Sequence, residues 1–216
     1  MSHRESAEHH AAAGGGRNVP SLGRSLAWGG LGFGLASLCV FATVAFAERW
    51  MYARLGLLGA YVAWTALFIL LGGGALGALV SGRWRLPRFY LLFGAAFFAY
   101  AACWVGAYFV LGGAAGEWVG SLAGSVGMGL ILAAGFGAAR RAWRLSAVLF
   151  AANSIGYFLG SALNDALGGR GGMLLWGVVY GLGLGAGLGA ALHLAQARGA
   201  GRDDSTPEPS FPSAGG

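Results

Sequence analysis

The chain has 216 residues, of which 56% are apolar and 10% are charged. A soluble domain carries about 25% charged residues, so this composition excludes a soluble enzyme, a disordered chain and a nucleic-acid-binding domain. We predict an all-α polytopic integral membrane protein, and its net charge of +6 fits the arginine excess that cytoplasmic loops carry.

The chain begins with a polar, glycine-rich segment, residues 1–25, and ends with a similar one, residues 197–216. Neither can bury a core, so both are predicted to be disordered cytoplasmic tails. Between them, residues 26–196 form the predicted transmembrane domain. It contains six apolar stretches of about 20 residues, the length that a bilayer requires: 26–47, 55–80, 89–111, 118–139, 145–167 and 173–196.

The first stretch ends in an Ala-x-Ala sequence at residues 45–47, which matches a signal-peptidase site. It is longer than the apolar core of a signal peptide, which has about 7–15 residues. We therefore predict a retained span, with cleavage as the alternative.

The arginines predict the orientation of the bundle. With the N-terminus in the cytoplasm, eleven arginines lie on the cytoplasmic side and three, Arg49, Arg54 and Arg170, lie outside. This bias follows the positive-inside rule, so both termini are expected in the cytoplasm and the protein in the cytoplasmic membrane.

A faint repeat links two parts of the chain. Trp84-Arg85-Leu86 recurs as Trp143-Arg144-Leu145, and similar apolar sequences follow each. The pattern predicts that spans two–three and four–five are related as parallel helical pairs, although shared apolar composition alone could produce it.

Glycine recurs every four residues in spans four and six. Residues four apart share one helix face, and small residues on one face let membrane helices approach closely. We expect tight helix packing there, with a glycine-lined crevice as the alternative. The glycines concerned are Gly120, Gly124, Gly177, Gly181, Gly185 and Gly189.

Span five carries a polar stripe formed by Asn153, Tyr157, Ser161 and Asn164. Unsatisfied polar groups cost several kcal/mol in hydrocarbon, so this stripe must face other helices or a wet path rather than lipid. Interhelical hydrogen bonding and the lining of a permeation path are both consistent with it.

Three ionisable residues lie near the ends of spans. Asp165 and Glu117 are expected at the outer surface, either as a solvated rim or as a titrating mouth. His193 is expected near the cytoplasmic end of span six, either as a group that titrates near neutral pH or as a histidine bonded to water or to a backbone carbonyl.

Chemistry in the membrane is not expected. A serine protease would need Ser125 beside His193, but their predicted depths differ by roughly 18 Å at a rise of 1.5 Å per residue. Cys39 and Cys103 lack the spacing of a redox pair and are expected to pack as small apolar residues. We expect no enzyme activity, no metal and no cofactor.

The sequence thus favours a channel- or transporter-like protein that moves a small solute or ion. The rival is a non-transporting accessory subunit of a membrane complex. The expected partners are the lipid bilayer and either further copies of the chain or another membrane protein, and no nucleic acid.

Overall fold

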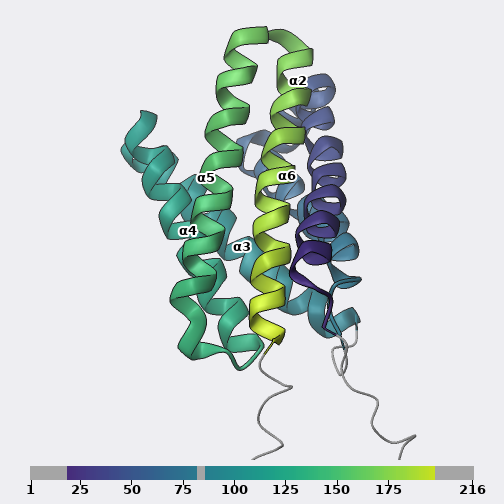
Figure 1. Ribbon diagram of the computed structural model, residues 1–216. Helices are drawn as coiled ribbons and strands as arrows, with labels where there is room; N and C mark the ends of the chain where they lie inside the picture. The colour runs from purple at the N-terminus through teal and green to yellow at the C-terminus, as the bar shows by residue number, and fades with distance from the viewer. Residues whose placement is uncertain (1–18, 82–85, 198–216) are drawn as a thin grey trace, which may run out of the picture.

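A computed structural model describes residues 19–81 and 86–197, which are helical and contain no strand (Figure 1). Five helices there are long and apolar enough to cross a membrane, as expected of an all-α membrane protein. Most of the two predicted tails lies outside the described residues. The helices are α2 (Leu22–Gly77), α3 (Leu86–Leu111), α4 (Gly113–Gly135), α5 (Ala142–Leu167) and α6 (Gly169–Gln196), with a short 3₁₀ helix, η1 (Ala139–Arg141), before α5.

Helix α2 has 56 residues and folds back on itself. A straight helix of that length would measure about 84 Å, nearly three times the thickness of a bilayer core. Gly56 interrupts it with φ 68° and ψ 177°, a conformation that essentially only glycine adopts. The rings of Phe33 and Phe68 stack with centroids 5.6 Å apart. The helix is therefore a hairpin, with a first arm before Gly56 and a second arm after it.

The helix ends differ from the boundaries expected from hydropathy. The first arm of α2 begins at Leu22 because the side chain of Ser21 caps it and accepts from the Arg24 N–H at 3.3 Å. It continues through residues 48–54, where a connection was expected, because that segment contains no glycine or proline. Apolarity therefore located the helices, but glycine and the cap set their ends.

The same glycine conformation forms three tight turns. Gly112 has φ 66° and ψ 165°, and Gly168 has φ 64° and ψ 174°, close to the values at Gly56. The three glycines are spaced 56 residues apart, and each follows a leucine. The described chain thus contains three consecutive helical hairpins whose turns are equally spaced: α2, α3–α4 and α5–α6.

Burial repeats with the same period. Leu76, Leu132 and Leu188 are spaced 56 residues apart and are all at most 1% exposed. A second set of buried positions, Gly73, Gly129 and Gly185, repeats in the same way. This repeat relates the two arms of α2 to α3–α4 and to α5–α6, whereas the sequence pattern suggested a relation between the predicted spans two–three and four–five. Trp84 and Arg85, on which that pattern partly depends, lie outside the described residues.

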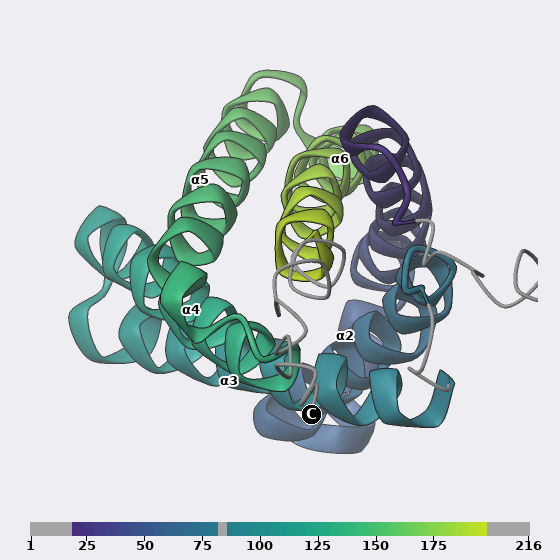
Figure 2. The same ribbon diagram turned by 60° about the horizontal axis from the view of Figure 1, so that its bottom comes forward.

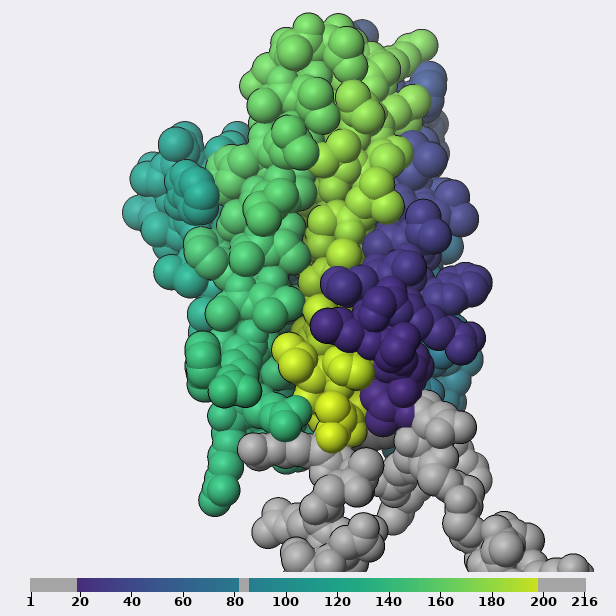
Figure 3. All heavy atoms as spheres, viewed as in Figure 1, coloured from purple at the N-terminus to yellow at the C-terminus, as the bar shows by residue number. Residues whose placement is uncertain are grey.

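The three hairpins close into a ring. A Cβ at Gly73 would lie 2.6 Å from the Tyr90 ring on α3, and one at Gly129 would lie 2.8 Å from the Ser146 nitrogen on α5. A Cβ at Gly185 would lie 2.6 Å from the Phe33 Cβ, which joins α6 to the first arm of α2. Figure 2 shows the resulting order around the bundle, and Figure 3 shows α6 between α2 and α5.

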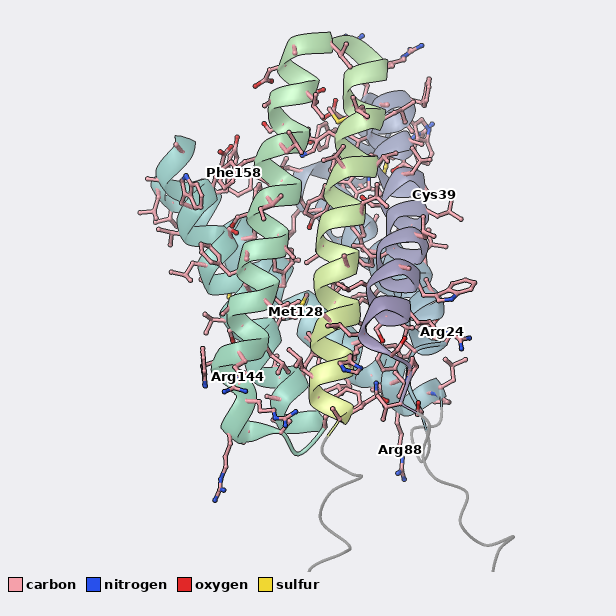
Figure 4. The ribbon with its side chains drawn as sticks, in the orientation of Figure 1. Arg24, Cys39, Arg88, Met128, Arg144 and Phe158 are labelled. Carbon is pink, nitrogen blue, oxygen red and sulfur yellow. The ribbon has the colours of Figure 1, made fainter. Side chains whose placement is uncertain are left out.

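The outer surface of the bundle is apolar. Leu58, Leu91 and Val110 are each more than three-quarters exposed, as expected of side chains that meet lipid rather than water. Cys39 and Cys103 are free and exposed, so they do not pack in the core as the sequence suggested. Figure 4 shows Cys39 on the outside of α2 and Met128, which is completely buried, between the helices.

Both ends of the described chain lie at one end of the bundle (Figure 1). Arg24, Arg88 and Arg144 lie toward that same end, whereas the α5–α6 turn lies at the other (Figure 4). We call these the arginine end and the glycine-turn end.

Candidate polar site inside the bundle

A cluster of hydrogen-bonded side chains lies at the middle of α5. Asn153 is completely buried, and its Oδ1 accepts from the Tyr100 hydroxyl at 2.7 Å. Its Nδ2 donates to Ser121 Oγ at 2.8 Å. The hydroxyls of Ser121 and Ser154 are 2.8 Å apart, and those of Tyr100 and Tyr180 are 3.1 Å apart. These five residues, the polar cluster, connect α3, α4, α5 and α6.

Glycines make room for the two tyrosines. A Cβ at Gly124 would lie 2.7 Å from the Tyr100 ring, and one at Gly156 would lie 3.0 Å from the Tyr180 carbonyl oxygen. Any larger residue would push α4 or α6 away from the cluster. Some glycines therefore position aromatic side chains, in addition to bringing helix backbones together.

Apolar side chains separate the polar cluster from the arginine end. On each of the four helices a buried apolar residue lies between the cluster and that end. These residues, which we call the apolar plug, are at most 1% exposed: Phe93, Met128, Leu132, Leu149 and Leu184. These side chains form a buried apolar layer between the polar cluster and the arginine end.

Glu117 and Tyr157 extend the polar region toward the glycine-turn end. The Tyr157 hydroxyl donates to Glu117 Oε1 at 3.3 Å, and its ring centroid lies 6.4 Å from that of Tyr180. Tyr157 is eleven residues before Gly168, or about 16 Å at the helical rise. Glu117 thus lies well below the α5–α6 turn, although its own helix begins only at Gly113.

The structure does not bring Asp165 to Glu117. Asp165 is exposed near the end of α5, eight residues after Tyr157, or about 12 Å along the helix. The two acids therefore do not share one level, and the sequence could not reveal this because the relative height of two hairpins depends on their packing.

The polar stripe of α5 divides between two environments. Asn153 and Tyr157 enter the buried region, whereas Ser161 and Asn164 are only partly buried. Within the described chain neither of the latter side chains forms a hydrogen bond. Asn164 instead lies at the turn, where its backbone oxygen accepts from the Gly168 N–H at 2.7 Å.

The C-terminal end of α6 is bonded to the segments that flank the first hairpin and to η1, which precedes the third. His193 Nδ1 donates to the Pro20 carbonyl oxygen at 2.8 Å, since a carbonyl can only accept. Gln196 Oε1 accepts from the Ser81 N–H at 2.8 Å, and Arg141 donates to the Leu194 carbonyl oxygen at 2.7 Å. His193 therefore lies at the arginine end, as part of a set of contacts that hold this end together.

Tyr100, Tyr180 and Ser154 are members of the polar cluster that the sequence did not single out. A tyrosine at mid-span was the available signal, because a buried phenol needs a hydrogen-bond partner. The described residues contain no group of three or more His, Cys, Asp or Glu that could hold a metal ion. Comparison of the chain with protein families, curated proteins and solved structures gave no match.

Proposed function

We propose that this protein is a carrier that moves a small polar solute across the cytoplasmic membrane, with the polar cluster as part of its binding site. The observation that carries the proposal is the completely buried Asn153, bonded to Tyr100 and Ser121 on two other helices. Polar groups inside a membrane protein are costly and commonly mark a substrate pathway.

The proposal takes each hairpin as two membrane crossings, so the chain crosses six times. Each turn glycine then lies outside and both termini lie in the cytoplasm, in accord with the concentration of arginine at one end. The hairpin geometry of α2 supports this count, because the stacked Phe33 and Phe68 rings lie on antiparallel arms.

The distribution of burial favours a carrier over an open channel. The apolar plug closes the route from the polar cluster to the arginine end, whereas Trp104, Glu117 and Trp176, toward the glycine-turn end, are only partly buried. A site that an apolar layer separates from one side of the membrane is what one state of an alternating-access cycle requires.

The internal repeat supplies a way for the bundle to move. Transporters commonly place their site between structural repeats that rock against one another. Here the polar cluster lies between the second hairpin, α3–α4, and the third, α5–α6. Opening toward the cytoplasm would then require release of the bonds at Arg141, His193 and Gln196, together with separation of the apolar plug.

Solute uptake into proteoliposomes tests this function. Purified protein is reconstituted, and uptake of a panel of amino acids, sugars, organic cations and organic anions is measured. The Asn153→Leu variant should reduce uptake of the transported solute by about tenfold or more, since it removes two polar contacts of the site. The control is Thr65→Val, because the Thr65 hydroxyl bonds only its own helix, at the Tyr61 carbonyl oxygen, 2.8 Å away.

The rival function is that of an accessory subunit. If no solute on the panel enters faster than in protein-free vesicles, and native protein co-purifies with one fixed membrane partner, the carrier function is wrong. In that case the polar cluster serves only to hold the helices together.

A further inference from the structure

Glu117 is a partly buried acid near the start of α4, with no basic partner among the described residues. The Tyr157 hydroxyl is the one polar contact that its side chain makes there. A carboxylate at this depth is expensive unless a positive charge accompanies it, and such residues are functional by default. A positively charged ligand can therefore supply the missing counter-charge.

Two indole rings contact the ring of Tyr157. The ring centroids of Trp104 and Trp176 each lie 5.4 Å from that of Tyr157, with interplanar angles of 61° and 65°. Tyr108 stacks on Trp104, with centroids 5.4 Å apart and planes inclined by 7°. Tyr157 thus brings an indole from α3 and one from α6 close to the acid, and an indole face is the best aromatic surface for a cation.

The two indoles also carry unused donors. Trp104 Nε1 and Trp176 Nε1 are buried and have no hydrogen-bond partner. A buried donor without a partner costs about 1–3 kcal/mol. A ligand that carries an oxygen acceptor beside its positive charge would satisfy one of these groups while its cationic part meets Glu117.

The donor set does not suit a metal cation. Calcium takes six to eight oxygen ligands and magnesium six, most of them carboxylate, carbonyl or water oxygens. Here Glu117 is the one carboxylate bonded to Tyr157, and the described residues contain no group of three or more His, Cys, Asp or Glu that could hold a metal ion. A single carboxylate and several aromatic faces favour an organic cation.

We infer that Glu117, Tyr157, Trp104 and Trp176 together bind small organic cations, namely protonated or quaternary amines that also carry a hydroxyl or carbonyl oxygen. The inference rests on the proposed function, because it gives the substrate class of the same site. Glu117 supplies the charge, the rings surround the ammonium group, and the indole N–H groups select for the oxygen.

Choline binding to the purified full chain in detergent, measured by calorimetry, tests this site. The comparison ligand is dimethylbutanol, the uncharged carbon analogue of choline, which should bind about tenfold more weakly or worse because it lacks the charge. Glu117→Gln should raise the choline Kd by about tenfold or more, while its amide oxygen can still accept from Tyr157. The control Asp165→Asn removes an equal charge at an exposed position and should leave the Kd unchanged.

The inference is overturned if dimethylbutanol binds as well as choline, if sodium at equal concentration displaces choline, or if Glu117→Gln binds normally. If that variant does not fold, as judged by gel filtration, the two ligands on the unsubstituted protein decide the matter. Binding and uptake are separate readouts. Choline binding without uptake of any solute contradicts the carrier function alone, and uptake of other solutes without choline binding contradicts the cation site alone.

Discussion

Substitution of Gly185 by alanine should destabilise the bundle, because α6 meets the first arm of α2 at this position. The new Cβ would collide with the Gly29 carbonyl oxygen and lie 2.6 Å from the Phe33 Cβ. Since backbone cannot rotate aside, overpacking should cost about 3 kcal/mol. Alanine recovers about 1 kcal/mol of helix propensity, which leaves a net loss of about 2 kcal/mol.

Gly171→Ala is the matched control on the same helix, because a Cβ at Gly171 would have no neighbour within 4 Å. It should gain up to about 1 kcal/mol from helix propensity. The two variants are compared by reversible denaturation in detergent, followed by circular dichroism. Equal stability of the two variants would refute the close contact between α6 and α2 on which the closed ring depends.

Three further predictions follow from the turns, the polar cluster and the topology. Gly168→Ala should lower the free energy of unfolding by about 1–3 kcal/mol in the same assay, because the φ of 64° and ψ of 174° at this position suit glycine alone. A variant as stable as the unsubstituted protein would contradict that turn. Asn153→Leu removes two interhelical hydrogen bonds, each of which contributes about 0.6 to 1.7 kcal/mol in a membrane. It should therefore lower the free energy of unfolding by about 1–3 kcal/mol. A larger loss would mean that the polar cluster is chiefly structural. The topology is tested in a chain without its native cysteines. Leu57→Cys and Arg170→Cys should react with an impermeant maleimide from outside the cell, whereas Ala197→Cys should react only after lysis. The opposite labelling pattern would mean that the orientation is reversed.

The sequence predicts the class of fold and part of the site. Apolar stretches locate every long helix, because hydropathy reports directly on contact with lipid. The polar stripe of α5 identifies Asn153 and Tyr157, since a polar residue in a membrane helix must have a partner. These inferences depend on one helix at a time, so no knowledge of packing is needed.

The remainder depends on how the helices meet. A hydropathy average does not detect a turn made by the single residue Gly56, so the expected connection at residues 48–54 is displaced. The 56-residue repeat does leave a signal in the sequence, because the Leu-Gly pairs at residues 55–56, 111–112 and 167–168 share its spacing. Only the folded chain shows that these glycines form the turns. The sequence also cannot pair Asn153 with Tyr100 or place Glu117 beside Tyr157, because the relative height of two hairpins is set by side-chain packing.

Counterflow most directly tests whether the polar site carries a solute through the membrane. Proteoliposomes are loaded with unlabelled choline, and the transient uptake of labelled choline is followed for the unsubstituted protein, Asn153→Leu and Thr65→Val. We predict a clear overshoot for the unsubstituted protein and for Thr65→Val, and none for Asn153→Leu. Uptake no faster than in protein-free vesicles, or an equal overshoot in all three proteins, would contradict transport of an organic cation through this site.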